Sequence, residues 1–128
     1  MNFYISDNHF GHSNIIRYDN RPFMNKKQMD ETMIDRWNEV VGDDDTIYIL
    51  GDFSWHKEQR KRTVEILNNL AGRKVLVKGN HDRISPKISK CFVKICDYLE
   101  ITDDKTRVVM SHYPMPFWNG QFRNSVHL

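Results

Sequence analysis

Residues that can bind metals or move protons follow four separate apolar segments of this chain. The segments are rich in β-forming residues, and in two of them a glycine precedes the polar side chain. Carboxylate oxygens, imidazole nitrogens and an amide oxygen form a mixed set of ligands that suits Mn, Fe, Zn or a similar divalent metal. The side chains in question are Asp7 and His9, Asp52, Asn80 and His81, and His112.

The elements that must position these side chains alternate between strand and helix patterns. Asn25 with Gln28 resembles a capping box, and the apolar stripe behind it, which includes Met29, Met33, Trp37 and Val40, predicts a helix over residues 25–41 that ends at Gly42. A second helix is predicted over residues 57–70, and strands are predicted over residues 2–6, 46–50 and 74–78. This order predicts an α/β fold with a mostly parallel central sheet and helices against it.

The chain changes character after Asp82. Residues 93–102 and 106–111 flank Asp103-Asp104-Lys105, a pattern that predicts a hairpin in a second, more antiparallel layer. In open α/β sheets the carboxyl ends of parallel strands converge on one crevice. We therefore expect the candidate ligands to meet, and Asp52, as a central carboxylate, could bridge two metal ions.

Composition narrows the class of protein. The 128 residues suit a single domain, residues 1–128, and 39% hydrophobic with 28% charged residues is typical of a globular chain. A net charge of +2 gives little support to nucleic-acid binding. No apolar run has membrane-spanning length and the start carries no signal-peptide pattern, so we expect a cytoplasmic protein that does not bind membranes. Cys91 and Cys96 are expected to be reduced, largely buried thiols.

The ordered motifs resemble those of the calcineurin-like metallophosphoesterases. The family signature of D-x-H, G-D, G-N-H-D/E and a later H is matched by residues 7–9, 51–52, 79–82 and 112, and the opening SDNHFGHSNIIRYDNRPF looks like that of small bacterial and phage members. The resemblance implies a four-layer α/β/β/α fold. It also implies hydrolysis of a phosphomonoester or phosphodiester by attack of a metal-bound hydroxide at a binuclear centre, and the expected substrate is a small molecule rather than nucleic acid.

The resemblance also implies roles for single residues. Asp7 and His9 would hold the first ion, Asn80 and His112 the second, and Asp52 would bridge them. Manganese, iron or zinc would serve as the two ions. The remaining histidine, His81, would be catalytic: it would face the substrate and either protonate the leaving oxygen or stabilise charge on the phosphoryl group, since an imidazole has an unperturbed pKa near 6.5.

One family motif has no counterpart in this sequence. G-H-x-H, which contributes a histidine to each metal in the family, does not occur after His112, and residues 125–128 resemble the strand that leads into it. From the resemblance we therefore expect a chain cut short of two ligands, with low activity. His127 could substitute for one of them, with an even chance that its side chain points towards the site.

Other residues and functions stay open. His12 could contact substrate phosphate or begin a short helix facing solvent, and Arg17 and Arg21 could clamp a phosphate, although pairing with Asp19 is favoured. His56 is expected at the rim or in a structural role. The aromatic residues at 113, 117, 118 and 122 could stack on a planar leaving group, but a packed loop is favoured. The alternative functions are a catalytically impaired relative that acts as a binding module and, with less support, a nuclease.

Overall fold

The computed structural model describes residues 1–55 and 60–128 and contains two sheets. The first is fully parallel, in the order β1 (Asn2–Ile5), β2 (Thr46–Ile49), β3 (Arg73–Val77), β4 (Lys94–Cys96). The second is mixed: β5 (Leu99–Asp103) pairs antiparallel with β6 (Thr106–Met110), and β7 (Ser125–His127) pairs parallel with β6. The predicted α/β fold class, with a parallel sheet and a more antiparallel second layer, is confirmed.

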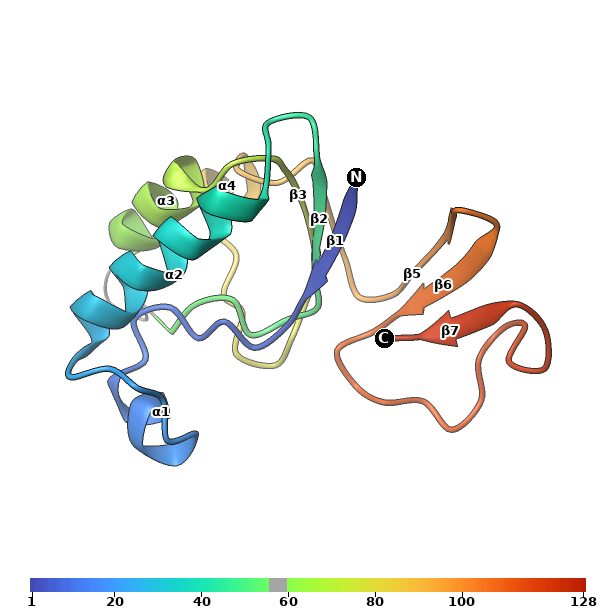
Figure 1. Cartoon of the computed structure of the whole chain (residues 1–128), viewed down its shortest axis with the longest axis horizontal. Helices are drawn as coiled ribbons and strands as arrows, with labels where there is room; N and C mark the ends of the chain where they lie inside the picture. The colour runs from blue at the N-terminus through green and yellow to red at the C-terminus, as the bar shows by residue number, and fades with distance from the viewer. Residues whose placement is uncertain (56–59) are drawn as a thin grey trace.

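Helices cover one face of the parallel sheet and the second sheet lies on the other (Figure 1). The helices are α1 (Ser13–Tyr18), α2 (Lys26–Val40), α3 (Arg60–Asn69) and α4 (Pro86–Ser89). In the part of the chain that the structure describes, the layers are therefore helix, sheet and sheet. No described helix covers the outer face of the second sheet (Figure 1).

The start of α2 follows from its capping residues. Asn25 accepts a hydrogen bond from the Gln28 backbone N–H at 2.9 Å, and the Gln28 side chain accepts one from the backbone N–H of Met24 at 2.8 Å. Met29 and Trp37 are buried, as predicted, but Val40 is 64% exposed because it lies off the buried stripe. The helix thus packs on the sheet through the predicted face, but Val40 is not part of that face.

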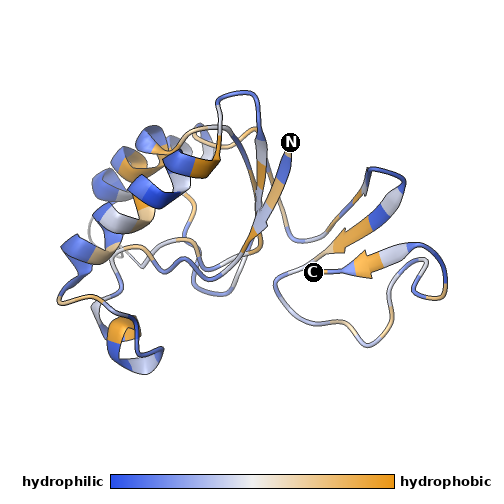
Figure 2. Cartoon of the chain, viewed as in Figure 1, coloured by the Kyte–Doolittle hydropathy of each residue, from blue (hydrophilic) through white to orange (hydrophobic). Residues whose placement is uncertain are grey.

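Two apolar cores separate the three layers, because alternate residues of the parallel strands point to opposite faces. Ile49 and Leu76 pack among the helices, while their neighbours Leu50 and Val77 pack between the two sheets. Figure 2 shows the hydrophobic sides of the helices turned towards the parallel sheet. The strands that end at the candidate ligands are therefore anchored on both faces.

The predicted hairpin is placed differently in the structure. Residues 93–102 were expected as one strand, but they divide into β4, which pairs with β3 in the parallel sheet, and β5, which pairs with β6. The turn consists of Asp104 and Lys105, both with positive φ (43° and 68°), and Asp103 already pairs with Thr106. This is the two-residue turn that matches the twist of a hairpin.

Three further expectations concern the start of α3, the two cysteines and membrane-spanning helices. The predicted helix start at residue 57 lies outside the described residues, and α3 is described from Arg60. Cys91 and Cys96 are free thiols, as expected, but each is half-buried rather than largely buried. None of the described helices combines the length and the apolar character needed to cross a membrane.

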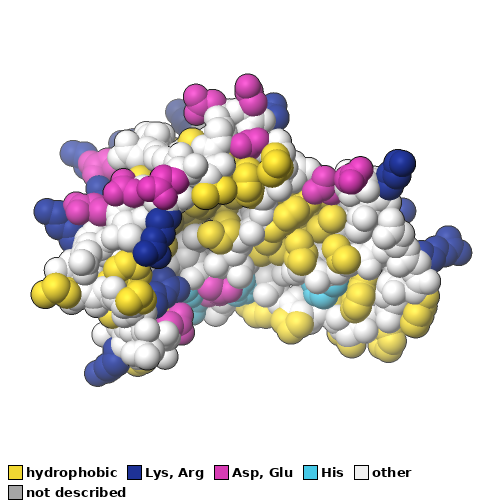
Figure 3. Space-filling model, in the orientation of Figure 1, with side chains coloured by type: hydrophobic (Ala, Val, Ile, Leu, Met, Phe, Trp, Pro, Cys, Tyr) yellow, Lys and Arg dark blue, Asp and Glu magenta, His cyan; other side chains and the backbone are white. Residues whose placement is uncertain are grey.

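The apolar layer between the sheets reaches the surface on one side. β1 and β7 are edge strands of their sheets, and hydrophobic side chains gather on the face between them (Figure 3). Ile5, Val126 and Leu128 are 37%, 42% and 43% exposed. An additional strand could pair with either edge and cover this surface.

Candidate metal centre

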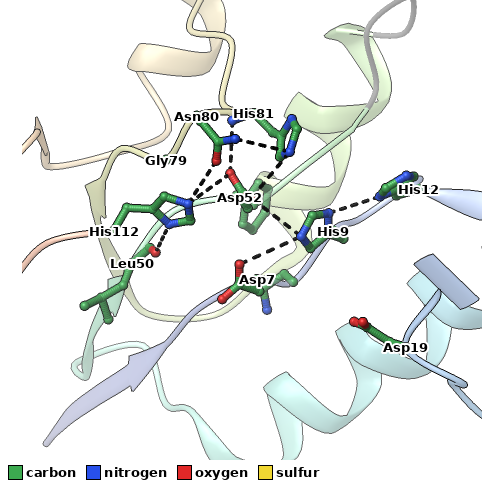
Figure 4. A network of polar contacts seen from close by, with 12 residues as sticks. Asp7, His9, His12, Asp19, Leu50, Asp52, Gly79, Asn80, His81 and His112 are labelled. Carbon is green, nitrogen blue, oxygen red and sulfur yellow. Dashed lines mark hydrogen bonds and ion pairs between the residues drawn. The ribbon is translucent and has the colours of Figure 1, made fainter. Parts of the chain in front are cut away.

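The side chains predicted to form the site meet at the carboxyl edge of the parallel sheet. Each comes from a loop at the carboxyl end of a strand: β1, β2 and β3 of the parallel sheet converge as their topology requires, and β6 of the second sheet adds His112. Figure 4 shows these side chains pointing towards one another around a central carboxylate. They are Asp7, His9, Asp52, Asn80, His81 and His112.

Asp52 supplies the central carboxylate and is buried. Its Oδ2 lies 3.7 Å from Nε2 of His9 and 3.9 Å from Nε2 of His81, and its Oδ1 lies 3.7 Å from Nε2 of His112. Asp7 adds a second carboxylate, with Oδ1 3.9 Å from Nε2 of His9. Ligand atoms of Asp7, Asp52 and His112 all lie within 4.8 Å of one another. The two oxygens of Asp52 thus face different histidines.

The contacts of His112 and Asn80 indicate a cation between them. Nδ1 of His112 lies 2.9 Å from the carbonyl oxygen of Leu50, which can only accept, so Nδ1 carries the proton and Nε2 is left with a lone pair. That lone pair faces Oδ1 of Asn80 at 3.0 Å. An imidazole nitrogen and an amide oxygen at this separation can both coordinate one cation, so these residues fit a metal ion.

His9 is oriented in a similar way by His12. The two Nδ1 atoms lie 3.1 Å apart, which leaves Nε2 of His9 directed at Asp7 and Asp52. Burial lowers the pKa of His9, although the carboxylate of Asp52 opposes the shift. A neutral imidazole is the form that binds metals.

Three of the candidate ligands have strained backbone conformations. Asp7, His9 and Asp52 have φ values of 52°, 53° and 52°, in the left-handed region that costs an L-residue about 1–2 kcal/mol. Such residues concentrate where the surrounding structure must aim a side chain at a functional site. The strain therefore supports a functional role for these three residues and the two loops that carry them.

Asp82 holds two of these loops together, a role that the sequence analysis did not assign. Its carboxylate accepts hydrogen bonds from the backbone N–H groups of Asp52 at 2.9 Å, Phe53 at 2.9 Å and Gly79 at 2.8 Å. Burial raises the pKa of Asp82, while the three N–H donors oppose that shift. The acid that ends the Gly-Asn-His-Asp motif is thus a buried residue that connects two loops through hydrogen bonds. The sequence carries no signal of this role, because the three backbone N–H donors come together only in the folded chain.

Arg21 has a structural role in the loop that follows β1. Its guanidinium donates to the backbone carbonyls of Asn8 at 2.8 Å and Asp7 at 2.9 Å, and lies 3.4 Å from a carboxylate oxygen of Asp19. The expected pairing with Asp19 is confirmed, and the carbonyl contacts hold the loop of the first ligands. Arg17 is exposed, with its guanidinium 5.3 Å from the centre of the Tyr18 ring.

Trp55 joins the site as a residue that the sequence analysis missed. Its ring stacks on His12 with centroids 4.5 Å apart and meets His81 edge-on at 4.4 Å. His12 is the N-cap residue of α1, and it is half-buried at the site rather than facing solvent. His56, expected at the rim, lies outside the described residues.

The C-terminal segment contributes differently from expectation. Nδ1 of His127 lies 3.0 Å from the carbonyl oxygen of Val109, and Nε2 accepts a hydrogen bond from the backbone N–H of Met115 at 3.0 Å, so the ring contacts backbone groups and not the candidate ligands.

The prediction that the aromatic residues after His112 form a packed loop is wrong for three of the four. They are exposed by 61%, 76% and 92%, in the order Tyr113, Phe117, Phe122.

Comparison with known proteins decides the family. The model of the calcineurin-like phosphoesterase family matches residues 3–114. The chain belongs to this family. Calcineurin-like phosphoesterases typically bind divalent metals, and the Asp7, Asp52 and His112 group of this member fits that property.

Relatives of this phosphoesterase-family chain include archaeal and phage proteins. It is 48% identical over 83 residues to an uncharacterised protein of Methanocaldococcus jannaschii, which covers 65% of this chain and 47% of that protein. It is 29% identical over 127 residues to the Gene 66 protein of Mycobacterium phage D29, covering 87% of this chain and 62% of the relative. The phage relatives agree with the predicted resemblance to small phage-type members.

A solved structure gives the same picture of the fold. The crystal structure of a protein of unknown function from Aquifex aeolicus superposes with a TM-score of 0.75 at 36% sequence identity, covering 89% of this chain and 61% of that one. The chain therefore spans between 47% and 62% of the length of these relatives.

Proposed function

We propose that this chain is a metal-dependent phosphoesterase that hydrolyses a phosphomonoester or phosphodiester at a centre of two divalent ions. The observation that carries the proposal is the pair of oxygens on Asp52. One faces His9 and the other faces His112, each at 3.7 Å from Nε2. A single carboxylate between two imidazoles from different loops is suited to join two cations.

The remaining ligands divide between the two sides of Asp52. Asp7 and His9 would hold one ion, because the Asp7 carboxylate lies beside Nε2 of His9. Asn80 and His112 would hold the other, because their acceptor atoms already face each other. Oxygen and imidazole donors suit manganese, iron or zinc.

Hydrolysis needs one bond made and one broken. Metal ions held by Asp7, His9, Asp52, Asn80 and His112 would acidify a water molecule and neutralise charge on the phosphoryl oxygens. A P–O bond forms from the water, which gives up a proton to the solvent, and the P–O bond to the leaving group breaks, with its electron pair going to the leaving oxygen. His81 would donate a proton to the leaving oxygen, since its Nε2 lies beside Asp52 and its side chain is 37% exposed.

Metal titration with hydrolysis assays tests this proposal. Calorimetry of the metal-free protein with Mn²⁺ or Zn²⁺ should show two ions per chain, and the loaded protein should cleave chromogenic phosphomonoesters or diesters. Asp52→Asn is the matched variant, because the amide keeps the acceptor for the backbone N–H of His81, 3.0 Å away, and removes only the charge. It should weaken both binding events together.

The outcomes separate the candidate functions. Unchanged metal binding in Asp52→Asn would show that this carboxylate does not bridge. Two bound ions without hydrolysis of any ester would instead favour the non-catalytic binding module.

A further inference from the structure

A cavity of about 210 Å³ opens directly beside His81, on the helix side of the parallel sheet. It is smaller than the roughly 300–1,000 Å³ of pockets for drug-sized ligands, so it suits one ring system or one short chain. Aromatic, apolar and cationic side chains contribute to its wall. Those that matter here are Trp55, His81, Arg60, Arg83, Ile84 and Phe92.

The position of His81 connects this cavity to the candidate metal centre. Nε2 of His81 lies 3.9 Å from Oδ2 of Asp52, and His81 also lines the cavity. A phosphoryl group bound to the metal ions that Asp52 would hold, on the side of His81, would direct its ester substituent past this ring. The space that receives the substituent is the cavity.

Trp55 is held rigidly as the wall next to His81. Its backbone N–H donates to the carbonyl of Phe10 at 2.8 Å, and its ring stacks on His12 with an interplanar angle of 16°. His12 in turn contacts His9. Because Trp55 also lines the cavity, it offers an aromatic wall that favours a flat partner: offset and edge-on ring pairs add about 0.5–1.5 kcal/mol beyond the area that they bury.

Two arginines add positive charge to the same cavity. The Arg83 guanidinium donates to the backbone carbonyls of Asn80 at 3.2 Å and Asp82 at 3.4 Å, which fixes it near the loop of His81. Arg60, the first described residue of α3, also lines the cavity. Guanidinium groups pack on ring faces and donate to acceptor substituents, so they also favour an aromatic group.

We propose that this cavity binds the leaving group of the phosphate ester and selects an aromatic ring over an alkyl chain. The inference rests on the proposed phosphoesterase function and adds its substrate class. Trp55 is then a specificity-determining residue, and the preferred substrates are phosphate esters of aryl or heteroaryl groups.

The test compares two phosphonates that cannot be hydrolysed at the carbon–phosphorus bond. Benzylphosphonate and n-butylphosphonate, together with inorganic phosphate, are titrated by calorimetry into the Mn²⁺-loaded protein. We expect benzylphosphonate to bind about 2- to 10-fold more tightly than butylphosphonate. In Trp55→Leu the ratio of the two affinities should fall towards one.

A second variant keeps the test decisive if Trp55→Leu does not fold. Ile84 is 38% exposed at the cavity, so Ile84→Trp should fill the space and abolish the preference for the benzyl group without disturbing the core. Equal binding of the two phosphonates to the wild-type protein, or a preference that survives Ile84→Trp, would overturn the inference. If inorganic phosphate itself fails to bind, the proposed function is wrong and the inference is overturned with it.

Discussion

Gly51 lies so close to the ring of His112 that no side chain fits between them. A Cβ on Gly51 would lie 2.3 Å from Nδ1 and 2.7 Å from Cγ of His112, and 2.8 Å from the Cα of Gly79. The φ of Gly51 is +88°, in the region that L-residues rarely adopt. Two constraints therefore require a glycine before Asp52: the positive φ of the turn, and the imidazole of His112 that packs against this position.

Gly51→Ala should consequently damage the candidate metal centre. The left-handed backbone alone should lower the free energy of unfolding by about 1–2 kcal/mol. Displacement of His112 should also weaken Mn²⁺ binding roughly 10- to 100-fold, the scale on which misoriented ligands lose metal. Calorimetric titration below the unfolding temperature and urea denaturation measure the two effects separately.

Gly72→Ala is the matched control. Gly72 has a φ of +86°, and its Cβ would lie 2.4 Å from Cδ1 of Ile47, away from the candidate ligands. This variant should lose stability on the same scale while the folded protein keeps its Mn²⁺ affinity. An equal loss of affinity in both glycine variants would mean that strain, and not the position of His112, controls metal binding.

Arg21→Ala should weaken metal binding even though Arg21 is not a candidate ligand. Its guanidinium holds the carbonyls of Asp7 and Asn8 and so supports the strained loop that presents Asp7 and His9. We expect about a 10-fold loss of Mn²⁺ affinity. Arg17→Ala, at an exposed position of α1, should leave the affinity unchanged, and a similar loss there would point to general electrostatics.

The convergence of the site was predictable because it depends on topology. Strand–helix–strand spacing forces parallel pairing, and parallel pairing brings Asp7, Asp52 and Asn80 to one edge of the sheet whatever the details of packing. The capping pair at Asn25 was predictable for a similar reason, since it is a local interaction between residues three apart.

Features that depend on partners distant in sequence were not predictable. Residues 93–102 have the composition of one strand, yet the chain passes from the first sheet to the second between Cys96 and Leu99. This break depends on pairing with β3 on one side and with β6 on the other, which the composition of the segment does not reveal. The role of Asp82 was not predictable either, because its three hydrogen-bond donors come from two loops. Trp55 contacts two histidines from other loops, and these contacts form only in the folded chain. Composition does not reveal contacts of this kind.

His81→Ala should lower hydrolysis by roughly 10²- to 10⁴-fold, the usual contribution of a positioned acid or base. Bound metal should be nearly unchanged, because His81 lies at the exposed side of Asp52 beside Trp55. Steady-state assays with a chromogenic diester, together with metal analysis of the same samples, measure both quantities. Loss of metal in this variant would make His81 a ligand and remove its role as a proton donor.

His127→Ala provides the control histidine. Both ring nitrogens of His127 contact backbone groups, so its loss should reduce stability without the large loss of turnover. A fall in rate comparable to that of His81→Ala, in samples shown to be folded, would place His127 in the catalytic chemistry.

A segment joined after Leu128 would begin beside the candidate metal centre. Leu128 lines a cavity of about 300 Å³ together with Asp7 and His112, and its backbone pairs with β6 through Val109 and Ser111. We expect an appended Gly-His-x-His segment, followed by strand-forming residues, to bring two more imidazoles to the ligands already present. The strand residues would also cover the apolar surface between β1 and β7.

The extended chain should therefore bind Mn²⁺ more tightly and hydrolyse a chromogenic diester faster than the 128-residue chain. A version with Gly-Ala-x-Ala in place of the two histidines separates the effects, because it can cover the apolar surface but adds no metal ligand. Higher stability in both versions with higher affinity only in the histidine version would assign the gain to coordination. Equal metal affinity and turnover in all three chains would show that the ligands from β1, β2, β3 and β6 suffice, since imidazoles delivered at Leu128 would then add nothing to the centre.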